Sequence, residues 1–147
     1  MKQQHRDRTR CPVACALDIL GDRWTLLIIR DLMFFEKHEY KDFLAAEEAI
    51  STNILSDRLN RLLDYNLIDV VPHPENGTRK LYYLTQKGKG LVETLTYLVR
   101  WSSDHLPDQV YIAEEKLEIL RDHPDLMIQN TLDELHKWEE KHGVKTF

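Results

Sequence analysis

The segment from Ile50 to Thr85 constrains the fold of this chain more than any other part of the sequence. It predicts a helix over Thr52–Tyr65, followed by two short strand-like runs at Leu67–Val71 and Lys80–Leu84. A helix followed by a hairpin is the element order of a winged helix-turn-helix, in which the hairpin is the wing. We therefore predict a mainly α fold with a small β-hairpin.

The predicted helix is amphipathic and has a clear start. Ser51 or Thr52 supplies a hydroxyl that can cap the first turn, because it can accept a hydrogen bond from a free backbone amide. Four leucines recur with the i, i+4, i+7, i+8 spacing of a buried stripe, namely Leu55, Leu59, Leu62 and Leu63. The opposite face is polar and carries Thr52, Asn53, Ser56, Asp57, Asn60 and Arg61.

This polar face has the chemistry of a DNA-reading surface. Asn can pair with adenine, Ser and Thr can bond to most base edges, and Arg can read guanine or hold phosphate. The first turn of a recognition helix usually does the reading, and backbone amides at a helix start can hold a phosphate oxygen. A solvated polar face with an ordinary cap would show the same pattern. The candidate DNA-binding residues of the helix are Ser51, Thr52, Asn53, Ser56, Arg58, Asn60 and Arg61.

The predicted hairpin has a basic tip. Pro72, Pro74 and Asn76-Gly77 mark the turn, and Asn-Gly is a strong hairpin signal. The tip brings two cations together, which suits contact with phosphate or the minor groove. An ordinary charged loop is the alternative, but a helix and a basic wing in this order are more specific than either alone. The candidate DNA-binding residues of the wing are Asn76, Thr78, Arg79 and Lys80.

Further helices are predicted on both sides of this segment. Cys11-Pro12 opens the first, because proline is favoured at the first helical position, and Thr85 caps a long helix after the hairpin. The expected helices cover residues 12–20, 22–35, 40–48, 86–104, 113–122 and 126–142. We divide the chain into a winged helix-turn-helix DNA-binding and dimerisation domain, residues 1–106, and an acidic helical C-terminal extension, residues 107–147.

Charge is distributed unevenly along the 147 residues. The net charge is −5 at pH 7, but residues 1–106 hold 15 basic and 15 acidic side chains. The excess therefore lies in residues 107–147, with 5 basic and 10 acidic side chains, whereas the first ten residues hold four basic and one acidic. Phosphate contacts need local positive charge more than a high isoelectric point, so the acidic total does not exclude DNA as a partner.

Composition also bounds the location and the cofactors. No apolar run approaches the roughly 20 residues that span a bilayer, and the polar, basic N-terminus lacks the apolar core of a signal peptide. Two cysteines cannot build a disulfide framework. The seven histidines are scattered without metal-binding spacing. We expect a cytoplasmic protein with no cofactor, no metal and no membrane partner.

Several short motifs keep a characteristic order and spacing between residues 11 and 103. They are Cys11-Pro12-Val13, Leu20-Gly21, Trp24–Ile28, Ile50-Ser51, Leu55–Leu59, Leu67-Ile68 and Tyr82–Gly88. This pattern resembles the HxlR family of bacterial winged helix-turn-helix regulators. The resemblance implies a homodimer built from the first and last helices, which binds a near-palindromic operator. It also implies a repressor or activator of nearby genes, often responding to oxidants, electrophiles or aldehydes.

Two departures from the family pattern are visible. Asn66 stands where the family usually has glycine, and asparagine tolerates the left-handed conformation that a helix C-terminus needs. The chain also continues past Pro107, near which family members usually end. The role of the extension is therefore the least constrained part of the interpretation.

A physical argument also favours a homodimer. The predicted 86–104 helix carries an apolar stripe longer than a small core can cover. A twofold dimer would bury the excess and place two recognition helices about one DNA turn (roughly 34 Å) apart. We therefore expect dimerisation helices to flank the winged helix-turn-helix. The extension could instead fold back over the stripe, extend the dimer interface or wall a ligand pocket, using Leu117, Leu120, Leu132, Leu135 and Trp138.

Cys11 is the candidate redox-sensing residue. It stands at the start of the first predicted helix, where the helix dipole and the nearby Arg8 and Arg10 favour a thiolate. Accessible thiolates react with oxidants and electrophiles, and the resemblance implies the same role, because the cysteine at this position is the sensor in several HxlR members. The alternative is a buried, inert residue. We interpret Cys15 as a small apolar filler; since a Cys11–Cys15 bridge would distort the helix, a disulfide would join two subunits.

We therefore expect a homodimeric, sequence-specific DNA-binding transcriptional regulator with no enzymatic activity. Its partners would be double-stranded DNA and a small-molecule or electrophile effector. A winged-helix protein–protein interaction module without DNA binding is the main alternative, which the net charge favours slightly. A thiol-dependent enzyme that uses Cys11 is a second alternative, but it needs a base that the sequence does not reveal.

Overall fold

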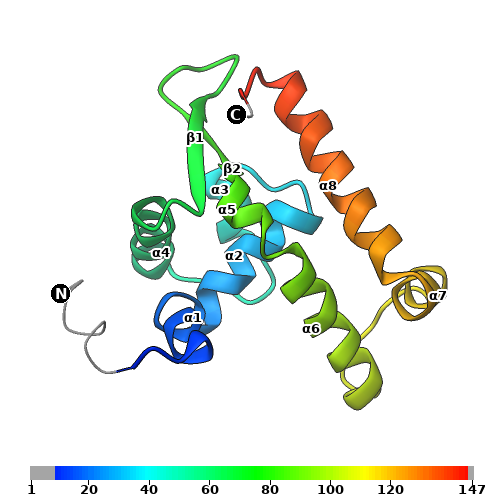
Figure 1. Cartoon of the computed structure of the whole chain (residues 1–147). Helices are drawn as coiled ribbons and strands as arrows, with labels where there is room; N and C mark the ends of the chain where they lie inside the picture. Colours follow the sequence, from blue (N-terminus) through cyan, green and yellow to red (C-terminus); the bar gives the residue numbers. More distant parts are fainter. Residues whose placement is uncertain (1–8, 146–147) are drawn as a thin grey trace.

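The computed structural model describes residues 9–145, so most of the predicted basic N-terminal arm lies outside the described residues (Figure 1). The described chain is mostly helical with one antiparallel hairpin, which confirms the predicted fold class. No helix in residues 9–145 is long and apolar enough to cross a membrane. The elements are α1 (Pro12–Leu20), α2 (Arg23–Phe34), α3 (Tyr40–Leu44), α4 (Thr52–Asp64), β1 (Ile68–Pro72), β2 (Lys80–Leu84), α5 (Gln86–Lys89), α6 (Val92–His105), α7 (Glu114–Asp122) and α8 (Pro124–Lys141).

Capping residues fix the starts of the helices that matter most for the site. The Asp22 carboxylate accepts hydrogen bonds from the backbone N–H groups of Trp24 and Thr25, at 3.0 and 3.1 Å, and so starts α2. Ser51 Oγ accepts from the N–H group three residues further on, at 3.3 Å, and starts α4 as predicted. After α4, Asn66 adopts φ 58, the left-handed conformation expected of the residue that replaces glycine.

Helix α2 runs through the middle of the molecule and organises the hydrophobic core. Its Ile29 is fully buried, and the helix packs against α4, β2 and α8. The leucine stripe of α4 belongs to the same core: Leu55, Leu59 and Leu62 are buried, and Leu63 is half-buried. The predicted inward face of α4 is thereby confirmed, and its polar face is left at the surface.

Helix α3 is shorter than the sequence predicts. It ends at Leu44 rather than near Glu48, because the chain turns before α4 and Ala49 takes the left-handed conformation, with φ 57. Tyr40, the first residue of α3, donates its hydroxyl to the Thr52 carbonyl oxygen at 3.0 Å. The short helix and the turn therefore support the start of α4.

The long helix predicted after the hairpin is divided into α5 and α6. The break falls at Gly90 and Leu91, so α5 stays against β2 while α6 runs on toward α7 and α8. The contact of α5 with the hairpin is close: a Cβ atom at Gly88 would lie 2.1 Å from the Leu67 carbonyl oxygen. Glycine is needed at this position because any side chain would displace the backbone of the residue that precedes β1.

The hairpin has the predicted strands, with the first shifted by one residue, so its connection is one residue shorter than the predicted residues 72–79. Ile68 pairs with Leu84 and Pro72 with Lys80, in antiparallel register, and residues 73–79 form the loop. Gly77 has no positive φ, so the chain does not make the tight turn that Asn-Gly favours. The wing loop instead contains two hydrogen-bonded turns, His73–Asn76 and Asn76–Arg79, rather than one two-residue turn.

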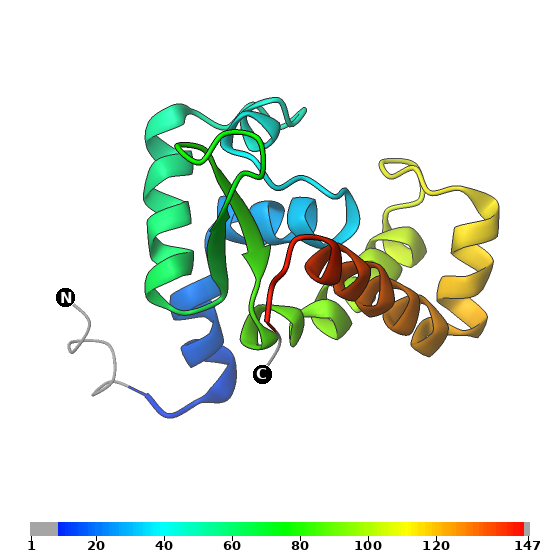
Figure 2. The same cartoon turned by 90° about the horizontal axis from the view of Figure 1, so that it is seen from above.

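The C-terminal extension folds back onto the rest of the molecule, on the side away from α4 (Figures 1 and 2). Ile128 and Leu135 of α8 belong to the main core, and α8 packs against α2, α6 and α7. Of the five residues named for the extension, Leu120 and Leu135 are buried and the other three are half-buried. Of the three roles considered for the extension, the structure therefore shows that it folds back. The predicted division at residue 106 falls in the loop between α6 and α7.

Candidate nucleic-acid interface

Helix α4 presents a polar, exposed face. Ser51, Thr52, Asn53, Ser56 and Asn60 are all exposed, and the leucines on the other side of the helix hold this face outward. The fold therefore brings the predicted polar residues of the helix together on one surface. Figure 1 shows α4 on the side of the molecule opposite α7 and α8, and the hairpin loop at the top of the view.

Some of these side chains already form hydrogen bonds within the protein. Ser51 Oγ caps the helix, and Ser56 Oγ shares a hydrogen bond of 2.9 Å with the Tyr40 hydroxyl. Thr52, Asn53 and Asn60 have no side-chain hydrogen bond within the described chain. These three are therefore the side chains best prepared to bond to an external partner, since they lose no internal bond in doing so.

The two arginines of α4, unlike Asn53 and Asn60, have partners within the described chain. Arg58 donates from Nε to the Asp22 carboxylate at 2.8 Å and also pairs with Asp57. Arg61 donates from Nη2 to the Asp18 carbonyl oxygen at 3.4 Å, and its Nη1 lies 3.8 Å from an Asp22 oxygen. The sequence placed Arg61 on the outward face, but in the structure both arginines reach back toward the junction of α1 and α2.

The wing loop is ordered by its own side chains. Asn76 accepts hydrogen bonds from the backbone and the hydroxyl of Thr78, at 3.2 and 2.7 Å. Arg79 pairs with Glu39, which also lies 3.6 Å from His73 Nε2. Lys80 is exposed and has no ion-pair partner among residues 9–145. The two predicted cations are thus not equivalent: Arg79 anchors the loop to the body, and Lys80 is available to a partner.

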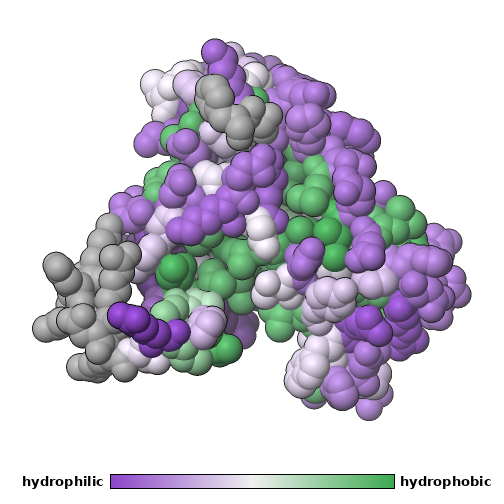
Figure 3. Space-filling view, viewed as in Figure 1, coloured by the Kyte–Doolittle hydropathy of each residue, from purple (hydrophilic) through white to green (hydrophobic). Residues whose placement is uncertain are grey.

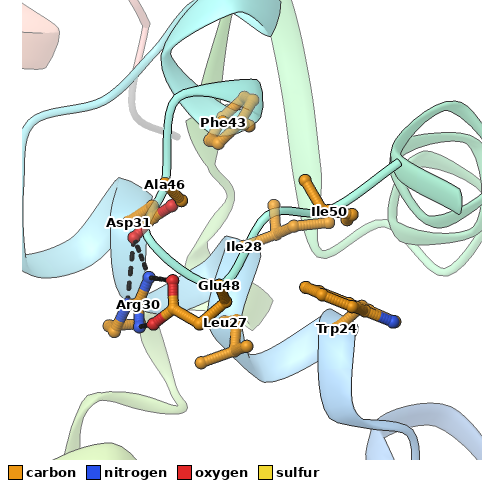
Figure 4. A pocket seen from close by; sticks show the side chains of 9 residues that line it. All are labelled: Trp24, Leu27, Ile28, Arg30, Asp31, Phe43, Ala46, Glu48 and Ile50. Atoms are coloured by element: carbon orange, nitrogen blue, oxygen red, sulfur yellow. Dashed lines mark hydrogen bonds and ion pairs between the residues drawn. The ribbon is translucent and has the colours of Figure 1, made fainter. Parts of the chain in front are cut away.

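An ion-pair network supports the chain just before α4 (Figure 4). Arg30 pairs with Glu48 and with the buried Asp31, and Lys37 lies 3.8 Å from Asp31. The pKa of Glu48 falls to about 2, because hydrogen bonds from Arg30 outweigh the opposing effect of burial. The small cavity beside it has a volume of about 10 Å³, which is enough for about one water molecule. This network therefore supports the turn that precedes α4.

A second cavity lies between the base of the wing and the end of α8. Its volume is about 140 Å³, and it is lined by Tyr83, Leu84, Thr85, Gln86, Lys89, Glu139, Val144 and Lys145. In its wall, Lys89 Nζ lies 2.8 and 3.1 Å from the two carboxylate oxygens of Glu139. Residues of the extension therefore wall a cavity as well as covering the core.

Cys11 is the N-cap residue of α1, Cys15 lies within α1, and both cysteines are exposed. The Cys11 backbone N–H donates to Thr9 Oγ1 at 3.1 Å, and Cys15 Sγ lies 3.8 Å from the Thr9 carbonyl oxygen. The interpretation of Cys15 as a core filler is wrong for this chain alone, because α1 has no buried residue. Neither thiol is bonded to a histidine within residues 9–145, and those residues contain no cluster of potential metal ligands.

Two exposed apolar surfaces accompany this arrangement. On α1, Val13 and Leu17 are 66% and 58% exposed, and on α6 Tyr97, Leu98 and Trp101 are 44–55% exposed. In Figure 3, hydrophobic surface gathers over and between the α1 and α6 regions of the visible face. Clustered apolar side chains at a surface are typical of contacts with another protein.

Sequence reasoning missed the residues that hold the interface in place. Asp22 and Glu39 fix arginines of α4 and of the wing, and Tyr40 fixes the first turn of α4. The sequence indicated Asp22 only as a helix start. Its partners Arg58 and Arg61 lie far along the chain, so no local pattern connects them.

Comparisons with known proteins place these features in a family context. A family model described as HxlR-like helix-turn-helix matches residues 19–110. The chain is 37% identical over 95 residues to Rv3095 of Mycobacterium tuberculosis, described as an uncharacterized HTH-type transcriptional regulator. That match covers 65% of this chain and 59% of the relative, so the chain spans about 59% of the length of this relative.

Solved structures agree with the family match. The crystal structure of PA1607, a candidate transcription factor, superposes with a TM-score of 0.64 at 33% identity, covering 75% of this chain and 76% of that one. The reduced form of the transcriptional regulator YodB from B. subtilis superposes with a TM-score of 0.53 at 28% identity, covering 66% and 95%. The family match ends at residue 110, so α7 and α8 lie beyond it.

Proposed function

Because the chain belongs to the HxlR-like helix-turn-helix family, we propose that it is a transcriptional regulator that binds duplex DNA as a homodimer. The observation that carries this proposal is the exposed face of α4, where Thr52, Asn53 and Asn60 have no internal side-chain partner in the described chain. Curated relatives are described as transcriptional regulators, which supports a regulator rather than an enzyme. The structural relative YodB is described in the same way.

In this proposal α4 enters the major groove. Asn53 and Asn60 would pair with bases, and Thr52 and Ser56 would bond to base edges or to phosphate. The backbone amides of the first turn, after Ser51, would hold a phosphate oxygen. Lys80, with Asn76 and Thr78, would bind the flanking backbone from the wing. Arg58, Arg61 and Arg79 would contribute only where they leave their internal ion pairs.

The homodimer is supported by the apolar surfaces of α1 and α6. Within the monomer, α1 packs against the core only through the partly buried Ile19 and Leu20, so most of this nine-residue helix gains little stability from packing. A twofold partner would cover Val13, Leu17 and Trp101 and would set two copies of α4 about one DNA turn (roughly 34 Å) apart. A near-palindromic operator follows from that symmetry.

Regulation through Cys11 is the finer part of the proposal. The thiol is exposed and stands at the start of the helix proposed for dimerisation. An oxidant such as diamide would take two electrons and two protons from two Cys11 thiols of different subunits and leave a disulfide. An electrophile with an activated double bond, or an aldehyde, would instead add to one sulfur: the S–C bond forms as the π bond of the reagent breaks, and the thiol proton passes to the carbon or oxygen of the adduct. Either reaction would change the position of α1 and so the spacing of the two α4 helices.

A winged helix that binds protein rather than DNA is the second candidate. The net charge of −5 and the acidic extension favour it. A protein-binding module makes no phosphate contacts, so it would show no salt-dependent affinity for duplex DNA. The test of the first proposal also separates it from this one.

The test is fluorescence anisotropy with duplexes from the DNA upstream of this gene, at two salt concentrations, with and without diamide. We expect tight binding to one palindrome, weakened by salt and by Asn53→Ala. Asn130→Ala, on the exposed side of α8, is the matched control and should bind like the wild type. Cys11→Ser should abolish the diamide effect. Salt-independent or absent binding to every duplex would contradict the DNA-binding function and favour the protein partner.

A further inference from the structure

Asp22 connects three parts of the molecule. Its carboxylate caps α2 through Trp24 and Thr25, and it also accepts from the Thr25 hydroxyl. The same two oxygens bind α4, at 2.8 Å from Arg58 Nε and 3.8 Å from Arg61 Nη1. One side chain at the junction of α1 and α2 therefore holds both arginines of the proposed DNA-reading helix.

We propose that Asp22 is a positioning residue that restrains Arg58 and Arg61 against the α1–α2 junction and limits their contact with DNA phosphate. The proposal rests on the DNA-binding function proposed for α4 and adds a control on its two cations. An arginine that is bound by a carboxylate must break or weaken that pair before it can bind phosphate in its place. Base contacts by Asn53 and its neighbours carry no such penalty.

The restraint is present at neutral pH. Burial opposes ionisation of Asp22, but the hydrogen bonds from Thr25 and Arg58 outweigh it and lower the pKa of Asp22 to about 2. The Arg58 pKa is raised, mainly by the hydrogen bond to Asp22. The Asp22 and Arg58 side chains are only 24% and 22% exposed, so solvent screens this pair less than it screens a surface pair. Both partners therefore stay charged across the physiological range.

The same contacts give α1 a route to the DNA-reading helix. Arg61 Nη2 donates to the Asp18 carbonyl oxygen, in the last turn of α1, at 3.4 Å. Only the C-terminal end of α1 packs against the core, through the partly buried Ile19 and Leu20, and no residue of α1 is fully buried, so core packing fixes its position weakly. A displacement of α1 would move Asp18 and Asp22 relative to α4. It would release the arginines or hold them more tightly, and so change the affinity for phosphate.

Asp22→Asn is the variant that tests the restraint. Asparagine is as good an N-cap as aspartate, so the start of α2 is retained, while the charge that holds Arg58 and Arg61 is lost. We expect the variant to bind random-sequence duplex about fivefold more tightly. We also expect log K to fall more steeply with log salt, by about 0.9 for each phosphate gained. Binding to the operator should gain less, so the ratio of specific to nonspecific affinity should fall.

Asp18→Asn is the matched control. It removes one negative charge from the neighbouring turn of α1, but the Arg61 contact is made to the backbone carbonyl and is retained. If the effect came only from the loss of one negative charge near DNA, the salt dependence of binding would change equally in both variants. The restraint predicts the steeper salt dependence in Asp22→Asn only. It predicts a smaller increase in the double variant Asp22→Asn, Arg58→Gln, in which only Arg61 is still released.

Two outcomes of the DNA-binding measurements would overturn the inference while the proposed function stands. In the first, the wild type binds DNA and Asp22→Asn has the same slope of log K against log salt as the wild type. In the second, Asp18→Asn changes this slope as much as Asp22→Asn does. Absence of wild-type binding at any salt concentration would instead remove the proposed function itself. Solvent exchange of the Arg58 Nε–H proton, measured by NMR, tests the Asp22–Arg58 contact in the absence of DNA. We expect slowed solvent exchange of this proton in the wild type and faster exchange in Asp22→Asn, and equal exchange in both would also overturn the restraint.

Discussion

The Trp138 ring of α8 is stacked on the buried His38 ring, with ring centroids 3.9 Å apart and planes inclined by 14°. His38 in turn bonds through Nδ1 to the Tyr82 carbonyl oxygen of β2 at 2.8 Å, and its own carbonyl accepts from the Tyr82 N–H at 2.8 Å. The extension therefore reaches the base of the wing through one histidine. Residues beyond the family match are built into the winged-helix body.

Trp138→Ala should destabilise the whole chain and not only the extension. The ring is half-buried, so we expect a loss of about 2 kcal/mol in the free energy of unfolding, below the usual range for a fully buried tryptophan. Urea denaturation followed by circular dichroism measures it. Leu126→Ala, at a position of the same helix that is 49% exposed, should change stability much less. Equal effects of the two variants would contradict the structural role of the stack.

Removing one partner of the Lys89–Glu139 pair should lower the free energy of unfolding, whereas replacing both partners with apolar residues should change it little. Glu139→Gln leaves the buried Lys89 ammonium without a counter-charge, and we expect a loss of roughly 3 kcal/mol in unfolding free energy. The double variant Lys89→Met, Glu139→Leu should stay within about 1 kcal/mol of the wild type, because apolar residues of similar size need no desolvation. Glu140→Gln, at an exposed neighbouring position, is the control. A double variant less stable than Glu139→Gln would refute this reasoning.

The Arg30–Glu48 pair should make stability depend on acid pH. The folded-state pKa of Glu48 is about 2, below its ordinary value of 4.5, so its contribution is full above about pH 4.5 and is lost as pH falls through about 2. Glu48→Gln should therefore be less stable than the wild type at neutral pH, and the difference should narrow at lower pH. Chemical denaturation across this range tests it, with Glu47→Gln at an exposed position as the control. A constant difference down to pH 2 would contradict the assignment.

Leu17→Asp should produce a monomer if α1 lies in the homodimer interface. A charge at the 58% exposed Leu17 should be tolerated in the monomer but should oppose burial against a second copy. Light scattering after size-exclusion chromatography gives the mass of the species in solution. Leu126→Asp, at a similarly exposed leucine of α8, should leave the mass unchanged. A dimeric Leu17→Asp, or a wild type that is monomeric, would exclude this interface.

Lys80 and Arg79 should contribute unequally to DNA binding. Lys80→Ala should reduce the salt slope by about 0.9, the value for one lost phosphate contact. Arg79→Ala should reduce it less, because Arg79 is already paired with Glu39. Lys116→Ala on α7 is the control for a general loss of positive charge. Equal slopes for Lys80→Ala and wild type would remove the wing from the interface.

Local patterns in the sequence determined most elements and the face of α4 that is exposed. The leucine spacing of α4 specifies a buried stripe whatever the helix packs against, so the exposed positions of Asn53 and Asn60 followed from the sequence. The caps at Ser51 and Thr85 are likewise local, since each hydroxyl bonds an amide three residues away. The order of helix and hairpin followed from the change of hydrophobic period between them.

The sequence did not predict where the long helix after the hairpin would break. That break depends on how closely α5 approaches the backbone of Leu67, which is a contact between segments and leaves no periodic signal. The shorter α3 has a similar origin, because the turn at Ala49 brings the chain to the start of α4. Helix ends of this kind are decided by packing and not by propensity.

The sequence by itself determined the kind of fold, the candidate surface of α4 and the position of a thiol at the start of α1, whereas the exposure of that thiol was found only in the structure. Only the tertiary structure decided which cations are available to a partner, because Arg58, Arg61 and Arg79 are bound by carboxylates distant in the sequence while Lys80 is not. It also decided that the extension covers the core through Ile128 and Leu135. The physical reason is the same in each case. Hydrophobic period and capping act over a few residues, whereas ion pairing and core contacts depend on which distant segments meet.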